Sequence, residues 1–251
     1  LIGGSVYLAD FISEADATGV ALGQGGNQLT SLAGIDVFAN AKQDSFSFAL
    51  TGVGSEGSSS LILTDASAAA IEGAGGGDQV NILGGALKAQ ADAVSESTSI
   101  DIQGGGFSID GAGLTATALA QAIATNGGAD TISVTGPSLD AIANARVNNA
   151  GIDVQLVGVT AGSLGMTAYA DSVGIDAGNG NDSVFNGAAL TSKADARASS
   201  SSVFFQGVGF DSDLASLSAY ANAIGLAGGG GRDALTNDGV IHSIAYAQIN
   251  N

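Results

Sequence analysis

The chain has 251 residues, 45% of them hydrophobic, and carries 24 acidic against 6 basic side chains, for a net charge of −18. Phosphate backbones and anionic lipid surfaces would repel such a chain, and no apolar run is long enough to span a bilayer, so neither a nucleic-acid partner nor membrane insertion is expected. The absence of cysteine excludes disulfides and thiolate metal sites, which leaves oxygen-binding cations as the natural ionic partners.

Glycine-rich turns recur along the chain at an almost constant interval. Each turn holds one polar residue at the same point, which we call its anchor. The anchors are Asn27, Asp78, Asp130, Asp182 and Asp233, and they are spaced 51, 52, 52 and 51 residues apart. Such regularity predicts repeat units that stack with equivalent residues directly over one another.

The first element after each turn is a stretch in which alanine alternates with polar residues, as in 86–94, 139–147 and 192–200. Alanine favours helix, but no apolar stripe of period 3.6 accompanies it. The alternation of period two therefore predicts a strand.

Two further elements complete each unit. An apolar run ending in glycine comes next, and a second alanine ladder then leads back to the turn. The apolar runs are 45–54, 99–106, 152–159 and 201–209, and the ladders include 116–122, 168–170 and 219–223. Eight residues before each anchor the side chain is always tiny (Gly or Ala), and the parity of the buried face changes there, which predicts a bend. A unit thus comprises three or four predicted strands separated by glycine turns.

Recurring strands without helices, in exact repeat, predict an all-β fold. We expect a single domain over residues 1–251, a parallel β-helix or β-solenoid of about five coils with about 51 residues per coil. The predicted units are 1–26 (partial), 27–77, 78–129, 130–181, 182–232 and 233–251 (partial). Coils would lie about 4.8 Å apart, and the small inward alanines would let opposing sheets approach closely.

The glycine turns could serve three purposes. A phosphate loop requires a following helix and usually a lysine, whereas here an apolar strand follows and the local charge is negative. Two alternatives remain open: a calcium turn, or a bare turn in which the aspartate caps its own backbone.

The turn sequences resemble the calcium-binding pattern G-G-x-G-x-D-x-U-x of the repeats-in-toxin (hemolysin-type) family. Residues 177–185 depart from it at the first glycine only, and 73–81 at the second. The resemblance implies that Asp78, Asp130, Asp182 and Asp233, with Asn27 at the first turn, would ligate Ca²⁺.

The likeness covers only about nine residues of each unit, because the family's repeats follow one another directly while here one match occurs per unit. Asn27 and the Arg232 beside Asp233 weaken the two end sites. Like charges stacked about 4.8 Å apart are costly without a cation between them, which favours calcium.

The remaining candidate residues give weaker signals. Five of the six basic residues follow a turn, near Asp44, Asp92 and Asp195, which indicates a solvated face with paired charges and no active site; the six are Lys42, Lys88, Arg146, Lys193, Arg197 and Arg232. His242 has no metal-binding companion, and Asp211-Ser212-Asp213 is expected to be a simple loop. Tyr169 and Tyr220 share one column and are expected to stack, either as cross-strand packing or as a sugar-binding surface.

These patterns predict a non-enzymatic, secreted structural protein, extracellular or at the cell surface. We expect a calcium-stabilised solenoid that self-assembles, head to tail or laterally, into a fibre, matrix or surface layer. The half-units at the two ends complement each other, so the chain either polymerises or is part of a longer solenoid. The alternatives are a glycan-binding adhesin segment with an extracellular polysaccharide as partner and, third, a polysaccharide lyase-like enzyme.

Overall fold

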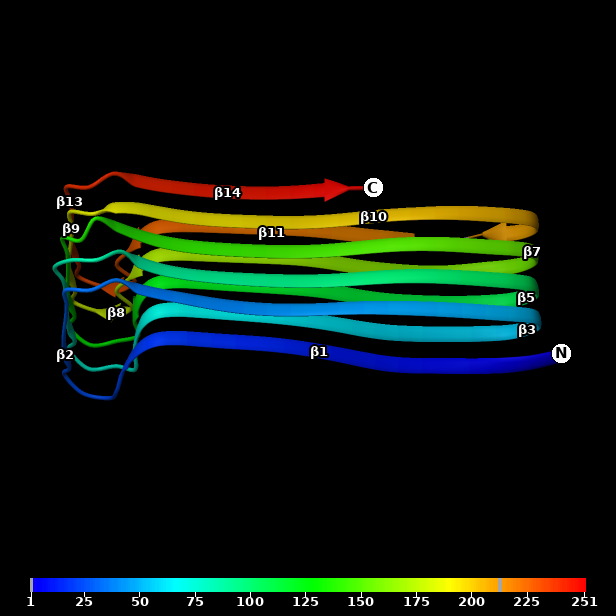
Figure 1. The fold of residues 1–251 in the computed structure, drawn as a ribbon, viewed down its shortest axis with the longest axis horizontal. Coiled ribbons are helices and arrows are strands. Elements are labelled where there is room, and N and C mark those ends of the chain that lie inside the picture. Colours follow the sequence, from blue (N-terminus) through cyan, green and yellow to red (C-terminus); the bar gives the residue numbers. More distant parts are fainter. Residues whose placement is uncertain (1, 212–213) are drawn as a thin grey trace.

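The computed structural model describes residues 2–211 and 214–251 and is all-β: strands make up 83% of the chain, and the described residues contain no helix. Long parallel strands lie in stacked sheets, which confirms the predicted solenoid architecture (Figure 1). No helix in this part of the chain could cross a membrane.

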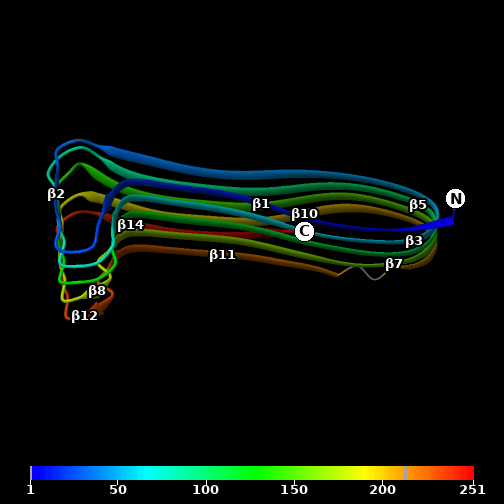
Figure 2. The same cartoon turned by 90° about the horizontal axis from the view of Figure 1, so that it is seen from below.

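The coils over 28–73, 79–125 and 131–176 each consist of one short strand and one very long strand. The long strand runs away from the glycine turns as an outgoing arm, bends, and comes back as a returning arm (Figure 2). The elements in chain order are β1 (Ile2–Leu22), β2 (Gln28–Ser31), β3 (Ile35–Gly73), β4 (Gln79–Ile82), β5 (Leu87–Thr125), β6 (Thr131–Val134), β7 (Ser138–Asp176), β8 (Asn179–Gly180), β9 (Ser183–Asn186), β10 (Ala189–Asp211), β11 (Leu214–Ala227), β12 (Gly230–Gly231), β13 (Ala234–Asn237) and β14 (Ile241–Asn250).

The prediction of three or four strands per unit, separated by glycine turns, was therefore wrong in detail. β3, β5 and β7 each continue for 39 residues through the distal bend, the bend farthest from the glycine turns. Glycines such as Gly106, with a φ of +142°, let the ladder curve there without breaking.

Pairing between coils follows the sequence repeat. Ile71 pairs with Val20 on one side and Ile123 on the other, and Ile123 pairs in turn with Ile175. The main sheet has the order β1-β3-β5-β7-β10-β14, with β11 paired to β7. The short strands form a second sheet, β2-β4-β6-β9-β13, and β8 pairs with β12. All these pairings are parallel, so equivalent residues lie over one another as predicted.

Alanine ladders from the two arms form much of the core. Ala89, Ala91 and Ala93 of the outgoing arm and Ala118 and Ala120 of the returning arm are fully buried. The two arms lie very close together, since the Ser172 hydroxyl on the returning arm of β7 donates to the Ala141 carbonyl on the outgoing arm, 2.8 Å away. The expectation that small side chains bring the sheets together is confirmed.

The tiny residue before each turn marks a bend, also as predicted. Buried residues alternate up to Ala122, but the adjacent Ile123 is buried as well, so the inward parity changes there. Strand pairing skips this column, as at a β-bulge. A Cβ at Gly174 would lie 2.7 Å from the Leu190 side chain on the opposite arm, which explains why only a small residue fits.

Near the distal bend, polar side chains point into the interior and apolar side chains point outward, the reverse of the usual arrangement. Gln103 and Gln155 point inward, are buried, and bond to each other at 2.8 Å, and Gln206 continues their column. Phe48 and Phe205, in contrast, lie on the outer face and are exposed.

Candidate functional site

The glycine turns lie together at the end of the molecule opposite the distal bend, where the short strands form a third side (Figure 1). They stack one per coil, because Gly76 donates its N–H to the Gly127 carbonyl at 2.7 Å and Gly128 donates to that of Asn179 at 2.8 Å. Gly76 and Gly128 have φ values of +108° and +118°, which favour glycine. The turns of neighbouring coils therefore lie directly over one another.

The five predicted site residues lie in one column along the stack, which we call the anchor column. In each step a carboxylate Oδ1 accepts the backbone N–H of the preceding anchor: Asp78 from Asn27 at 2.9 Å, Asp130 from Asp78 at 2.7 Å, Asp182 from Asp130 at 2.8 Å, and Asp233 from Asp182 at 3.0 Å. The bare-turn alternative had each aspartate capping its own backbone. Instead, these carboxylates join one coil to the next.

The three inner aspartates each keep one oxygen without a partner. Asp78, Asp130 and Asp182 are exposed by only 2%, 1% and 2%, and the Oδ2 atom of each has no hydrogen-bond donor among the described residues. Asp78 Oδ2 lies inside its turn, 2.9 Å from the point where a Cβ on Gly73 would be. A buried polar atom left unsatisfied costs about 1–3 kcal/mol, and a charged one costs more.

Asn27 shows which kind of side-chain group suits the anchor position inside the turn. Its Nδ2 donates to the carbonyl oxygens of Gly23 at 2.6 Å and Gly25 at 2.8 Å, and to Asp78 Oδ1 at 2.9 Å. The register of the repeat places an aspartate oxygen in the corresponding position of the other turns. A carboxylate oxygen has no hydrogen to donate, so it could bind such carbonyls only through a proton or a cation.

The electrostatics point the same way. Burial raises the pKa of Asp182 above its ordinary value, against the opposing effect of the hydrogen bond from the Asp130 N–H, and the negative charges of Asp130 and Asp233 raise it further. At Asp182 these effects favour either a proton or a bound cation.

The donor groups of the turns suit calcium in kind. Ca²⁺ takes six to eight oxygen ligands, and the turns offer carboxylate and backbone carbonyl oxygens. Within residues 2–211 and 214–251, however, no three acidic or imidazole groups converge on a point that could hold a metal. Four of the five anchors supply one carboxylate each and the first is Asn27, so an ion between coils would depend mainly on backbone carbonyls.

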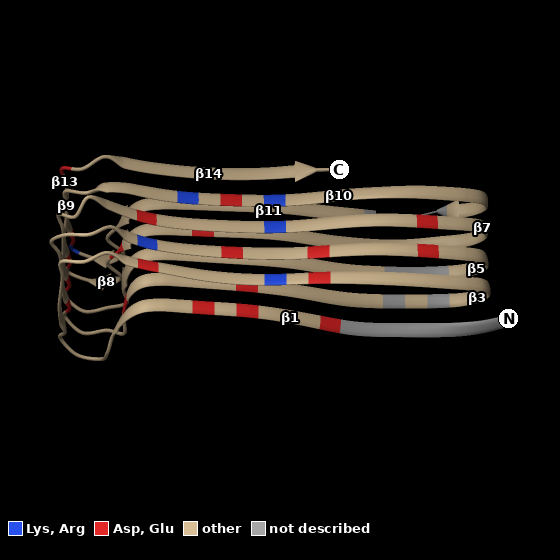
Figure 3. Ribbon diagram, viewed as in Figure 1, with Lys and Arg blue, Asp and Glu red and all other residues tan. Residues whose placement is uncertain are grey.

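Charged residues occur on neighbouring outgoing arms of the ladder (Figure 3). Lys42 Nζ lies 3.0 Å from Asp44 and 3.4 Å from Glu96, and Arg197 binds Asp195 at 2.7 Å. These contacts confirm the predicted pairing of charges at Lys42 and Arg197.

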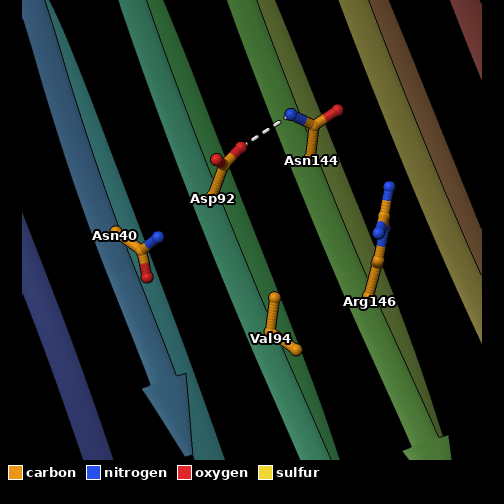
Figure 4. A pocket seen from close by; sticks show the side chains of 5 residues that line it. All are labelled: Asn40, Asp92, Val94, Asn144 and Arg146. Atoms are coloured by element: carbon orange, nitrogen blue, oxygen red, sulfur yellow. Dashed lines mark hydrogen bonds between the residues drawn. The ribbon is translucent and has the colours of Figure 1, made fainter.

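Asp92, which we also expected beside a basic residue, is instead bound by amides. It accepts hydrogen bonds from Gln90 at 2.9 Å and Asn144 at 2.6 Å. With Asn40, Val94 and Arg146, Asp92 and Asn144 line a shallow depression of about 150 Å³ (Figure 4). The depression is open and small, and its one carboxylate already has two donors.

The tyrosine column stacks as predicted. The rings of Tyr169 and Tyr220 are 5.1 Å apart and nearly parallel, at 6°. The lone His242 is exposed on β14. The predicted Asp211-Ser212-Asp213 loop falls on residues 212–213, which lie outside the described part of the chain.

The inward glutamines were not among the residues predicted from the sequence. Gln103, Gln155 and Gln206 are spaced 52 and 51 residues apart, so the same repeat that located the anchors also contained this column. What the spacing could not show was that the glutamines, and not the neighbouring apolar residues, point inward.

Comparisons with known proteins give no match: no protein-family model, no curated protein and no solved structure is similar to this chain. The resemblance to the repeats-in-toxin family therefore rests on the turn sequences alone.

Proposed function

We propose that the chain is a non-enzymatic structural protein, a stiff β-solenoid that self-assembles into an extracellular fibre, matrix or surface layer. The observation that supports this proposal best is the in-register ladder that joins β1, β3, β5, β7, β10 and β14. Each long strand is hydrogen-bonded along most of its length to its neighbours. A continuous ladder of this kind resists bending and is suited to a mechanical role.

The same ladder offers a route to assembly. β1 and β14 border the main sheet, and an edge strand presents N–H and C=O groups that can pair with another chain. A second copy added head to tail would continue the stack with the same repeat. The net charge of −18 keeps separate chains apart until these charges are screened or neutralised.

Calcium is the second part of the proposal. An ion held between anchor carboxylates of neighbouring coils would supply a partner for the buried Oδ2 atoms of Asp78, Asp130 and Asp182. It would also reduce the repulsion along the column. Extracellular modules bind Ca²⁺ with dissociation constants of about 10⁻⁴–10⁻³ M, which suits a protein that assembles outside the cell.

Electron microscopy of the purified chain, with calcium or with EDTA, tests both parts. We expect filaments or sheets, more abundant with calcium. A variant with Asp78→Asn, Asp130→Asn and Asp182→Asn should assemble equally under both conditions, because amides need no ion. Separate short particles under every condition would contradict assembly, whereas filaments that ignore calcium would contradict only the ion.

Glycan binding is the alternative function, favoured by the stacked Tyr169 and Tyr220. Aromatic rings that stack on an outer face are a common surface for sugars. Binding on a glycan array that is lost in Tyr220→Ala, and kept in the control Tyr246→Ala on β14, would support this alternative.

A further inference from the structure

The outer face of the outgoing arms carries a contiguous row of apolar side chains near the distal bend. They belong to four neighbouring strands and are aligned by the register, so that Phe48, Ile100, Ile152 and Val203 form one row and Leu50, Ile102, Val154 and Phe205 form the next. With Phe46, these residues are here called the distal stripe.

The exposure of the distal stripe is built into the sheet. Phe48 and Phe205 are 58% and 61% exposed, while the residues of opposite parity point inward and include the bonded column of Gln103, Gln155 and Gln206. A shift of one residue would exchange the two faces. The stripe cannot turn inward, because that shift would expose the alanine ladder of the same strand.

The distal stripe has the size of a small contact surface. The five residues from Phe46 to Leu50 occupy about 17 Å along one strand, and four coils occupy about 19 Å across the ladder, which gives a projected area of about 300 Å². Val53, Val157 and Val208 are also exposed, nearer the bend, and are not counted in the stripe. A standard protein–protein interface buries about 800 Å² of accessible surface per partner, and side chains that protrude expose more than their projected area. Isolated apolar residues on a surface are ordinary, whereas contiguous apolar patches of a few hundred Å² are often functional.

Charge and periodicity identify what covers it. The stripe residues carry no charge, although the chain as a whole carries −18, so this face is where two copies can meet with the least repulsion. Its rows repeat at the rise of the ladder, about 4.8 Å, and a surface that interdigitates with every row must have the same rise. Another copy of this chain has that rise, whereas a lipid surface or an ordinary globular protein does not.

We propose that the distal stripe is a lateral self-association surface, through which two solenoids pack with their outgoing arms face to face. The inference deepens the proposed structural function and rests on it for the idea of assembly. It concerns contacts beside the stack, which are independent of pairing at the sheet edges. A contact between identical patches is isologous and closes as a dimer, so end-to-end growth would produce filaments two solenoids wide.

Analytical ultracentrifugation at low calcium tests the proposal. We expect a wild-type dimer and a double variant Phe48→Glu/Phe205→Glu whose mass is halved, because the substitution places like charges in facing rows. Phe38→Glu is the matched control: Phe38 lies on the same strand, is 53% exposed and lies outside the stripe, and this variant should remain dimeric. Equal masses for the wild type and the double variant would overturn the proposal.

Cross-linking gives a measurement that does not depend on disrupting the surface. The chain has no cysteine, so Phe46→Cys introduces a unique thiol within the stripe. Mild oxidation should yield covalent dimers, while Phe38→Cys should yield none. An equal yield from both variants would overturn the proposal.

Two further outcomes separate this proposal from its alternatives. Filaments one solenoid wide in the wild type would leave end-to-end assembly intact and overturn the lateral contact, whereas dimers without filaments would support the lateral contact and contradict the fibre. A monomeric wild type that binds phosphatidylcholine vesicles, with binding lost in Phe48→Glu/Phe205→Glu, would assign the stripe to lipid and overturn self-association.

Discussion

Asp182→Asn tests the account of the anchor column most directly. The substitution keeps an Oδ1 that can accept the Asp130 N–H, now 2.8 Å from the carboxylate. It replaces the buried Oδ2, which has no donor among the described residues, with an amide nitrogen. Asn27 shows that an amide at this position donates to two turn carbonyls and to the next carboxylate.

The expected effect is stabilisation without calcium. Relief of one unsatisfied buried oxygen corresponds to about 1–3 kcal/mol in the free energy of unfolding. For a chain of this size 1 kcal/mol shifts the melting temperature by about 2–4 °C, so at about pH 7 in EDTA the variant should melt several degrees above the wild type. Asp36→Asn, which removes an equal charge from an exposed site, should shift the melting temperature much less.

The difference should depend on pH in a defined direction. Burial raises the folded-state pKa of Asp182 above 3.8, so the folded wild type holds this proton more tightly than the unfolded chain. The stability gained in this way is complete below about pH 4 and is lost as the pH rises through the raised pKa. The advantage of Asp182→Asn over the wild type should therefore shrink on acidification.

Circular dichroism melts of the wild type, Asp182→Asn and Asp36→Asn, with EDTA or calcium and at neutral or acidic pH, measure all three effects. Calcium should raise the melting temperature of the wild type more than that of Asp182→Asn. A variant that melts below the wild type in EDTA at neutral pH, while Asp36→Asn is unchanged, would refute the argument that the buried oxygen is a cost.

Three other substitutions test the glycine turn, the alanine core and the inward glutamines near the distal bend, each by thermal or chemical denaturation. Gly128→Ala should destabilise the fold strongly, since the φ of Gly128 is +118° and a Cβ there would overlap the Gly76 carbonyl. Gly127→Ala, whose Cβ would lie 3.5 Å from the nearest atom, should be far milder. Equal effects of the two variants would contradict the proposed tight packing of the turn. Ala118→Leu should cost about 1–3 kcal/mol, because the fully buried position has no room for a longer side chain, and a neutral result would mean that the arms can separate. Gln155→Leu should lower the free energy of unfolding by about 1–3 kcal/mol, because it leaves the Gln103 Oε1 acceptor without the donor it has now. A stabilised variant would show that the inward glutamine column does not stabilise the fold.

The stack itself could be predicted from the sequence. Anchors 51 or 52 residues apart, with a tiny residue eight positions before each, require equivalent residues to lie over one another, and Ile71, Ile123 and Ile175 do so. The alternation of alanine also predicted strands correctly against its helix propensity. A repeat determines register because any slip of a coil would misplace every one of its columns at once.

The composition of the candidate site was also evident in the sequence, since all five anchors lie in one column. The way the carboxylates are used was decided by tertiary structure. A carboxylate can bond its own turn or the next coil with the same sequence around it. Only the distance between coils determined that Asp78 bonds the N–H of Asn27 and leaves its other oxygen buried.

The region near the distal bend, where glutamines point inward, was likewise predicted only in part from the sequence. Alternation in 99–106 and 201–209 indicates that one side of the strand is apolar, but it does not say which side faces the core. In this chain the strand is continuous from the alanine ladder, so Ala89, Ala91 and Ala93 fix the inward parity for the residues that follow. Gln103 must then point inward and Ile102 outward, because a strand that continues without a bulge cannot change its faces.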